Sequence, residues 1–461
     1  MPSWTEVGNA ERLIDRFGDK IRFCRDQRTW YCWDGLHWVE DIGGSNDRPG
    51  PMMTQHAIET SLAIIDEKVS DELEEGLMKW QKASLNTGKI DAMIRLAQSQ
   101  GNVGIPLADL DSQLDHVNCR NGSVNLETGK LAPHLPANLH TKCLDVEFKA
   151  GQVSDIWSTF LRQVFDDDTE LIEFVEQAIG YSMSARTSEQ CLFFLYGAGQ
   201  NGKSVFIHTL KSILSGRNSN DGYAVTAGPT VLLSTGATSE QKYDLSRLRG
   251  ARLLSATENK EGREWNEETV KRITGEDFIT AREMYKPQFE FRPICKIWFS
   301  SNHRPIVRGI DHAIWRRIRL IPFNRIFSGK ARDPELGRKL MEDRDAIFSQ
   351  MVAGAQRWYQ DGLHTPLSIQ TAVDSYRHDM DPLSDFLATR VKFAPNAKVK
   401  IADLYNRYLA YCKRETEIPI PKRDMIKRLI ANPSVTRCNV GRDKGLRGIL
   451  PVEFADSSME G

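Results

Sequence analysis

The sequence lacks long apolar runs and any clustered cysteine pattern. Among its 461 residues, no uninterrupted apolar stretch approaches the roughly 20 residues needed to cross a bilayer. The eight cysteines are scattered without a C-x-x-C pair, which argues against a zinc ribbon or a disulfide framework. The start of the sequence also lacks the pattern of a signal peptide. These absences predict a cytosolic protein that does not associate with a membrane.

Net charge is also nearly absent, because 61 basic residues oppose 62 acidic ones. The charges are nevertheless distributed unevenly. Residues 390–450 contain 15 basic and 5 acidic residues, a local excess of +10, so the remainder of the chain carries −11. This asymmetry indicates a basic module near the C-terminal end, for which nucleic acid is the expected partner.

The length and the succession of patterns predict three parts. Residues 1–150 combine helical segments with short hairpin patterns and are expected to form an α+β domain. Residues 151–380 alternate apolar strands with helices, which is typical of an α/β nucleotide-binding core. Residues 381–461 form the basic module. In the first part, Trp30, Trp33 and Trp38 belong to a dense aromatic stretch that is predicted to pack a small sheet rather than to stack nucleic-acid bases.

A glycine-rich loop is the strongest motif in the sequence. The stretch "FLYGAGQNGKSVF" contains the spacing Gly-x-x-x-x-Gly-Lys-Ser, which is that of the phosphate-binding P-loop. An apolar strand pattern precedes it and a helical pattern follows it, which is the setting that such a loop requires. The residues expected to bind a nucleoside triphosphate are Gly197, Ala198, Gly199, Gln200, Asn201, Gly202, Lys203, Ser204 and Val205.

Two further strands end in polar residues that suit triphosphate chemistry. Lys203 would contact the outer phosphates, while Ser204 and Glu258, at the end of "ARLLSATE", would bind Mg²⁺. Glu258 would also polarise the attacking water, and Asn302, after "KIWFSS", would orient it. A nucleoside triphosphate and Mg²⁺ are therefore the expected ligands, and the family resemblance described next implies that the nucleotide is ATP. The expected catalytic set is Lys203, Glu258, Asn302, Arg316 and Arg317, the two arginines being alternative candidates for a finger that stabilises the γ-phosphate.

In this order, the motifs resemble the superfamily III helicase core of phage and plasmid primase-helicases, relatives of the poxvirus primase-helicase. The resemblance is most specific over about 190–325, and "CRNGSVNLETGKLAPH" resembles the domain that precedes the core in that family. It implies an AAA+-like P-loop core in which Glu258 is the Walker B acid and Asn302 is sensor 1. Asn259 departs from the pattern, because several members of the superfamily have two adjacent acids there.

The resemblance also implies a DNA-contacting hairpin within residues 271–292. "FITAREMY" and "FEFRP" are expected to pair as strands, with Lys286 at the tip and Lys271 at the start of the segment. Without the resemblance, Lys286 would be taken as an ordinary exposed lysine in a turn. Polymerising primase activity is not predicted, because residues 1–150 contain no clustered acidic metal-binding motif.

The basic module has the element order of a winged-helix domain, namely a helix, a basic helix and a basic hairpin. "KIADLYNRYLAYC" places Ile401, Leu404, Tyr405, Tyr408 and Leu409 on one predicted helical face. The basic helix and the hairpin would contact a groove and the phosphates, respectively. The candidate DNA-binding residues are Lys271, Lys286, Lys422, Arg423, Lys427, Arg428, Arg442 and Lys444.

The predicted function is that of an ATP-dependent replicative DNA helicase from a phage, plasmid or integrated mobile element. It would form a ring, expected to be a hexamer, on single-stranded or forked DNA, and a separate primase is a candidate partner. Two alternatives remain at this point. A nucleotide-switched initiator would bind or melt an origin without processive unwinding, and a small-molecule P-loop kinase would need no DNA stimulation and would leave the basic module unexplained.

Overall fold

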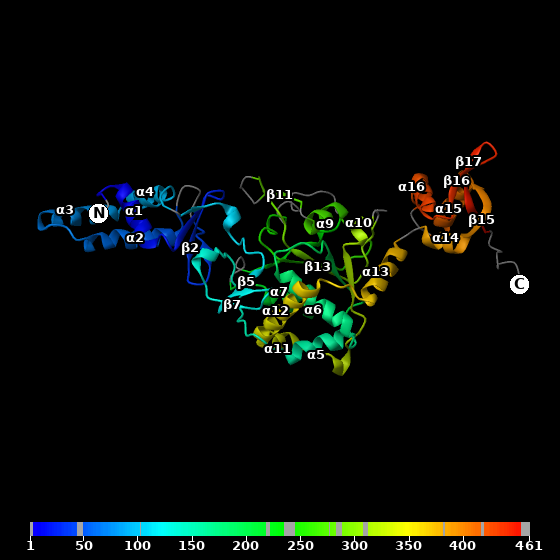
Figure 1. The fold of residues 1–461 in the computed structure, drawn as a ribbon, viewed down its shortest axis with the longest axis horizontal. Coiled ribbons are helices and arrows are strands. Elements are labelled where there is room, and N and C mark those ends of the chain that lie inside the picture. The colour runs from blue at the N-terminus through cyan, green and yellow to red at the C-terminus, as the bar shows by residue number, and fades with distance from the viewer. Residues whose placement is uncertain are drawn as a thin grey trace. The chain divides into compact units, whose positions relative to one another are not determined.

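The computed structural model describes residues 3–43, 49–101, 103–217, 222–234, 245–275, 277–282, 288–307, 312–380, 383–415 and 419–452. The chain forms two compact units (Figure 1). The first comprises Met1–Pro305 and Arg316–Ile369, and the second comprises Ile306–Trp315 and Gln370–Gly461. The first unit therefore contains both the expected N-terminal domain and most of the expected nucleotide-binding core. Across the described ranges, no helix is both long and apolar enough to cross a bilayer.

The N-terminal part of the first unit packs four helices against a small mixed sheet of strand order β3-β2-β1-β4 among the described residues. Trp30 and Trp38 are buried, which confirms that they contribute to the core of this sheet. The elements are α1 (Glu6–Phe17), β1 (Ile21–Cys24), β2 (Thr29–Trp33), β3 (Trp38–Glu40), α2 (Pro51–Leu62), η1 (Ala63–Asp66), η2 (Asp71–Leu73), α3 (Glu74–Ser84), α4 (Thr87–Ala97) and β4 (Gly104–Ile105).

Short antiparallel strands and two helices connect this part to the central sheet. The hairpins expected around "CRNGSVNLETGKLAPH" are present, because β5 pairs with β6 and β6 pairs with β7. Ser154 and Asp168 each accept a backbone N–H bond at the start of the helix that follows them. The elements are η3 (Leu107–Asp109), β5 (His116–Cys119), β6 (Gly122–Asn125), β7 (Leu131–Ala132), η4 (Pro136–Asn138), α5 (Asp155–Val164) and α6 (Thr169–Met183).

A parallel sheet of order β14-β8-β13-β10-β9 forms the centre of the first unit. The inner strands β8 and β13 are buried along almost their whole length, as expected for strands covered on both faces. The strands and the elements between them are β8 (Leu192–Tyr196), α7 (Lys203–Ile213), β9 (Ala224–Thr226), η5 (Pro229–Val231), β10 (Leu253–Glu258), α9 (Glu267–Thr274), β11 (Ile279–Arg282), β12 (Gln288–Phe291), β13 (Lys296–Ser301) and β14 (Ile318–Pro322).

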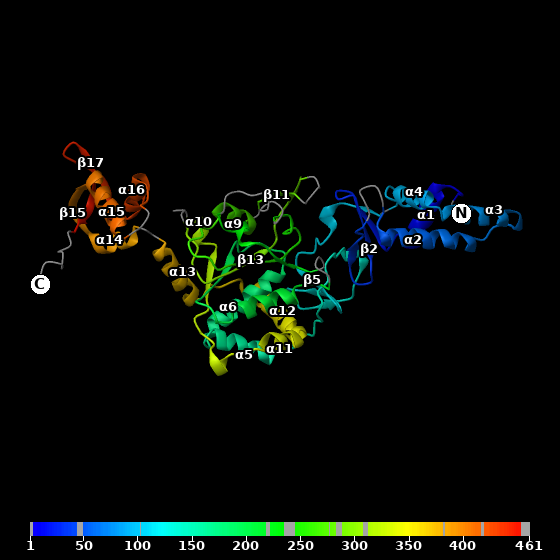
Figure 2. The ribbon, with the colours of Figure 1, turned by 180° about the vertical axis from the view of Figure 1, so that it is seen from behind.

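The helices α5, α6, η6 (Gly329–Ala331), α11 (Leu336–Glu342) and α12 (Arg344–Asp361) complete the first unit. In both views, α6 and α12 lie together beside the sheet (Figures 1 and 2). Their close approach depends on two glycines. A Cβ atom on Gly180 would lie 2.1 Å from the backbone nitrogen of Ala355, and one on Gly354 would lie 2.3 Å from the carbonyl oxygen of Glu176. The crossing therefore leaves no space for even a methyl group.

The second unit contains α10 (His312–Trp315), most of α13 (Leu367–Asp379) and the basic module. Its described strands form an antiparallel sheet of order β15-β17-β16, against which α15 and α16 pack. Leu404, Tyr408, Met425 and Leu429 are buried in its core, whereas Leu409, at the margin of the predicted helical face of α15, is partly exposed. The elements are α14 (Ser384–Arg390), β15 (Val391–Lys400), α15 (Ile401–Glu415), α16 (Lys422–Ala431), β16 (Thr436–Val440) and β17 (Asp443–Pro451).

The glycine contact between α6 and α12 predicts a specific loss of stability. Gly180→Ala should lower the free energy of unfolding by about 1–3 kcal/mol, because the added methyl group forces backbone apart in a packed interior. Gly88→Ala is the matched control, since Gly88 also lies in a helix but a Cβ atom there would meet nothing within 4 Å. That control should be neutral or stabilising by up to about 1 kcal/mol. Equal denaturation midpoints for both variants would contradict the packing described.

Candidate functional site

The glycine-rich loop, residues 197–204, connects the end of β8 to the start of α7. Gly199 and Gly202 have φ values of +103° and +88°, which favour glycine over other residues. A Cβ atom on Gly197 would lie 2.3 Å from the carbonyl oxygen of Phe323. The strand, loop and helix predicted from the sequence are therefore present. The first backbone N–H groups of α7 have no partner within the helix, which makes its N-terminus favourable for an anion.

Lys203 is buried at the base of this loop. The hydrogen bonds that it donates there all go to neutral oxygens. Its Nζ donates to the carbonyl oxygen of Gly197, to Oδ1 of Asn201 at 3.1 Å and to Oδ1 of Asn302 at 3.0 Å. Burial lowers the pKa of Lys203 to about 8. The structure thus brings together Lys203 and Asn302, two residues that the sequence assigned to one site although they lie 99 positions apart.

Glu258 lies at the same edge of the sheet. In the parallel register, Glu258 is opposite Ser301 of β13, and Ser301 is opposite Tyr196 of β8, so three strand ends are level. The Oε1 atom of Glu258 accepts backbone N–H bonds of 2.8 Å from Asn259 and Lys260. Its Oε2 atom is 3.7 Å from Nε of Arg263. The carboxylate is therefore held at the strand end and has no adjacent acid to share its role.

The oxygens available at this edge suit a magnesium ion. Ser204 is exposed in the first turn of α7, and Glu258 supplies a carboxylate from the neighbouring part of the sheet. Mg²⁺ prefers such oxygen ligands and is commonly held by one or two protein groups together with substrate phosphates and water. The donor set predicted from the sequence is thus chemically appropriate for the magnesium complex of a nucleoside triphosphate.

The two candidate arginines lie away from the glycine-rich loop of their own chain. Both precede β14, whose first residue, Ile318, pairs with Leu192 at the start of β8, whereas the loop follows the end of β8. Four residue steps along β8 separate Leu192 from Tyr196, which corresponds to about 13 Å along the strand. Arg317 is buried and its Nε donates to Oγ1 of Thr274 at 3.0 Å, whereas Arg316 is exposed. Of the two, Arg316 has the side chain that is accessible to another molecule.

The DNA-binding candidates fall into two groups. In the first unit, β11 pairs with β12 as expected, Lys271 on α9 lies 3.8 Å from Glu267, and Lys286 lies outside the described residues. In the second unit, the basic side chains gather on α16 and on the turn between β16 and β17. Of these, Arg428 is half-buried, and the exposed residues are Lys422, Arg423, Lys427, Arg442 and Lys444.

Three polar contacts at the site have no recognisable signal in the sequence. Asn201 donates through Nδ2 to the carbonyl oxygen of Phe323 at 2.9 Å, which fastens the loop to the segment after β14. The guanidinium of Arg304 lies 4.7 Å from the ring centre of Tyr196, at the loop end of β8. Arg263 faces Glu258, as described above. The contacts of Asn201 and Arg304 depend on which strands are neighbours, and residue spacing alone does not give that information.

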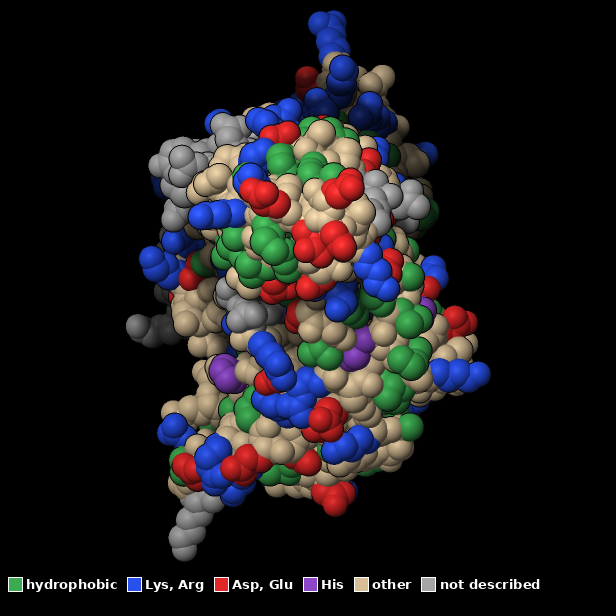
Figure 3. Space-filling view, turned by 90° about the vertical axis from the view of Figure 1, so that its left-hand side faces the viewer, with side chains coloured by type: hydrophobic (Ala, Val, Ile, Leu, Met, Phe, Trp, Pro, Cys, Tyr) green, Lys and Arg blue, Asp and Glu red, His purple; other side chains and the backbone are tan. Residues whose placement is uncertain are grey.

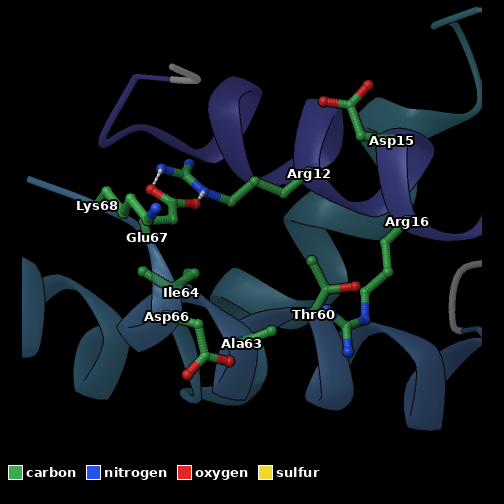
Figure 4. A pocket seen from close by; sticks show the side chains of 9 residues that line it. All are labelled: Arg12, Asp15, Arg16, Thr60, Ala63, Ile64, Asp66, Glu67 and Lys68. Atoms are coloured by element: carbon green, nitrogen blue, oxygen red, sulfur yellow. Dashed lines mark hydrogen bonds and ion pairs between the residues drawn. The ribbon is translucent and has the colours of Figure 1, made fainter.

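The N-terminal part contains a cavity of about 430 Å³ that differs from the site at the glycine-rich loop (Figure 4). Arg12 forms a two-point ion pair with Glu67, with Nη2 2.8 Å from Oε2, while Asp15 points away from that pair. On the face drawn in Figure 3, basic, acidic and hydrophobic side chains are interspersed. The Arg12–Glu67 pair in this cavity thus joins α1 to the segment after η1, which favours a structural role for these two residues.

Two families match parts of the chain. Residues 10–166 match the family described as D5 N terminal like, and residues 195–317 match a family of unknown function, DUF5906. The second match begins within β8 and ends at the candidate arginines. The two matched ranges therefore cover the N-terminal part and the site built around Lys203.

Similar proteins occur in large DNA viruses. A protein of Acanthamoeba polyphaga mimivirus, provisionally named a helicase, is 24% identical over 330 residues, which cover 67% of this chain and 34% of that protein. An African swine fever virus protein, provisionally named a primase, is 24% identical over 315 residues, 63% of this chain and 32% of the other. Primase D5 of fowlpox virus is 26% identical over 194 residues, 40% and 23% of the two chains. The chain spans about a third or less of each relative.

Solved structures of the NrS-1 C-terminal region without ligand have a similar fold. One has a TM-score of 0.51 at 10% identity and covers 96% of this chain and 99% of the other. A second has a TM-score of 0.50 at 12% identity, with coverage of 94% and 96%. These structures show a similarity of fold alone. The match of residues 10–166 to the D5 N terminal like family and the viral relatives support a relationship to D5-type primase-helicases, which the resemblance of the motifs predicted.

The lowered pKa of Lys203 predicts how affinity for ATP depends on pH. If the ammonium binds phosphate, the apparent Kd for ATP should rise as pH increases above about 8, by up to about tenfold per pH unit, because a proton must be taken up before binding. Titration calorimetry between pH 7 and pH 9.5 measures this. Lys203→Arg keeps its charge throughout the range, so its weaker affinity should not change with pH. A wild-type affinity that is constant up to pH 9.5 would contradict the assignment.

Proposed function

We propose that this chain contains the ATP-driven motor of a replicative DNA helicase of superfamily III. The observation that carries the proposal is the convergence of Lys203, Asn302 and Glu258 at one edge of a parallel sheet, next to a glycine-rich loop. The sheet order β14-β8-β13-β10-β9 supports an AAA+-like core, in which the strand bearing the loop lies between the strands bearing Asn302 and the arginines.

Each residue has a definite part in the proposed hydrolysis of ATP. Lys203 exchanges its contacts with neutral oxygens for the phosphate oxygens, which frees the amide of Asn302 to orient the attacking water. Glu258 accepts a proton from that water at the adjacent strand end. When bound, Mg²⁺ neutralises charge on the phosphates, and the residues that would hold it are Ser204 and Glu258.

The position of the arginines supports assembly into a ring. Arg316 precedes the start of β14, at the end of the sheet away from its own glycine-rich loop, so it would act on the triphosphate of a neighbouring chain. A head-to-tail interface of this kind forms a ring when the rotation that relates neighbouring chains closes on itself. The proposed assembly is a hexamer. Arg317 would instead support the fold through its hydrogen bond to Thr274.

Contacts with DNA are proposed for both units. The second unit has the element order of a winged-helix domain, and α16 carries exposed basic residues on the side opposite Met425 and Leu429. Lys286, between β11 and β12 and outside the described residues, is the proposed contact with single-stranded DNA in the ring. The names of the viral relatives, helicase and primase, favour a role in DNA replication. A phage, plasmid or other mobile element is the proposed source, and a separate primase is a possible partner.

Mixing two inactive variants tests the shared site. Arg316→Ala and Lys203→Ala should each lose nearly all ATP turnover, since arginine fingers contribute about 10³–10⁵ in rate. In a random equal mixture, about a quarter of the interfaces combine an intact loop with an intact arginine, so phosphate release should recover toward that fraction of the wild-type value. Arg317→Ala is the comparison for Arg316→Ala. We expect it to lower the melting temperature of the protein, because Arg317 would support the fold. If the two variants are shown to assemble together and phosphate release still does not recover, the proposal of a shared site is wrong.

Charge removal from α16 tests the proposed DNA contact. Arg423→Ala combined with Lys427→Ala should weaken duplex binding and reduce the slope of log K against log salt by up to about two, roughly 0.9 for each lost phosphate contact. Lys79→Ala combined with Lys82→Ala removes two exposed charges from α3 and is the matched control. Fluorescence anisotropy at several salt concentrations measures both. Unchanged slopes in the α16 variant would argue for a different ligand of the basic module.

A further inference from the structure

The side chain of Arg316 contacts a glutamine from a distant part of the chain. Its Nη2 atom donates to Oε1 of Gln190 at 3.4 Å, although 126 positions separate the two residues. Gln190 is half-buried and lies just before β8, whereas Arg316 is exposed. Arginine has five N–H donors, and this bond uses one of them. The amide therefore restrains the guanidinium and leaves its positive charge and most of its donors available.

The backbone of Gln190 has an unfavourable conformation that its surroundings hold in place. Its φ of +44° lies in the left-handed region, which residues other than glycine seldom adopt. The N–H group of Gln190 donates to the carbonyl oxygen of Thr187 at 3.0 Å. In the preceding residue, Glu189, the N–H group donates to Oη of Tyr181 at 3.3 Å, and Oε1 accepts a bond of 2.8 Å from Nε1 of Trp358. Strain of this kind persists only where surrounding contacts fix the backbone, and it is common at functional sites.

The main chain around Arg316 is also fixed, at the boundary between the two compact units. Arg316 is the first residue after the chain returns from the second unit to the first. Its carbonyl oxygen accepts from Nη1 of Arg319 at 2.7 Å, and the carbonyl oxygen of Arg317 accepts from the N–H group of Leu192 at 2.8 Å. These bonds hold the backbone but not the long side chain of Arg316. Gln190 adds a contact to the guanidinium itself.

A restraint on this guanidinium has a consequence for catalysis, because the proposed target of Arg316 belongs to another chain. An exposed arginine has many rotamers, and the entropy lost in ordering them opposes its contact with a phosphate. A side chain that is restrained beforehand loses less freedom when the neighbouring triphosphate arrives, and a fixed orientation also favours the chemical step. A neutral amide suits this task, because a carboxylate would offset the positive charge that an arginine finger needs.

We infer that Gln190 is a positioning residue for Arg316 and thereby promotes ATP hydrolysis in the neighbouring chain. Its amide acts through the arginine and does not contact the nucleotide. This inference rests on the proposed function, because it assumes that Arg316 acts on the triphosphate of a neighbour. It goes beyond that function in assigning a role to the turn before β8, which lies outside the motifs that identify the nucleotide site.

Two substitutions in the full chain test this role. Gln190→Ala removes the amide, whereas Gln190→Asn adopts the left-handed backbone more readily but is shorter by one carbon and no longer reaches Arg316. Each should lower kcat for ATP by about three- to tenfold, the usual effect of one lost hydrogen bond. The KM for ATP and the melting temperature should stay at the wild-type values. Gln360→Ala removes an exposed amide from α12 and is the matched control, which should leave kcat unchanged.

Mixed assemblies show on which chain Gln190 acts. In an equal mixture with Lys203→Ala, about half of the Gln190→Ala loops would meet an intact Gln190 and Arg316, so turnover per Gln190→Ala chain should rise to at least about half of the wild-type value. In an equal mixture with Arg316→Ala, no chain supplies both residues, so turnover should not rise. A mixture of the wild-type chain with Lys203→Ala is the reference for any loss that inactive subunits cause.

The reverse pattern would overturn the inference. If Gln190 supported only the fold or the nucleotide site of its own chain, activity would recover with Arg316→Ala and not with Lys203→Ala. Recovery with neither variant, or a wild-type kcat in Gln190→Ala or Gln190→Asn, would equally contradict it. The proposed function fails separately, if the wild-type chain has no ATP turnover or if the mixture of Arg316→Ala with Lys203→Ala does not recover.

Discussion

The hydrogen bond between Lys203 and Asn302 is the interaction on which the proposed chemistry depends. It forms because β8 and β13 are neighbours in a parallel sheet and end at the same level, with Tyr196 opposite Ser301. The next strand, β10, ends at that level with Glu258. The buried ammonium has no carboxylate among the partners that hold it at the loop, and burial lowers its pKa. An incoming phosphate would therefore meet a cation held by weak neutral contacts that it can replace.

The remaining parts of the first unit serve to hold that edge in place. Asn201 fastens the glycine-rich loop to the segment after β14, and Gly180 and Gly354 allow α6 and α12 to pack at backbone distance. At the opposite edge of the sheet, Arg252 donates to the carbonyl oxygens of His116 and Met183 at 2.7 Å each. That buried cation links the N-terminal part to the sheet.

The sequence predicted the strands of the sheet well because buried parallel strands are continuous apolar runs bounded by polar residues. The ends of β8, β10 and β13 followed directly, and with them the places of Lys203, Glu258 and Asn302. The roles of adjacent arginines could not be separated in this way, because the burial of Arg317 depends on Thr274, a residue 43 positions away. Helical spacing alone did not give the width of the buried face of α15, so it did not show that Leu409, at the margin of the predicted face, is partly exposed.

The central claim is that this chain hydrolyses ATP in response to DNA. Phosphate release by the wild-type chain, measured with and without a forked DNA and with Glu258→Gln as the reference for background, tests it most directly. The account predicts turnover that depends on Glu258 and that rises when DNA is added, since the ring would close around a strand and align neighbouring sites. Turnover that equals the Glu258→Gln background, with or without DNA, in a chain shown to be folded would contradict it.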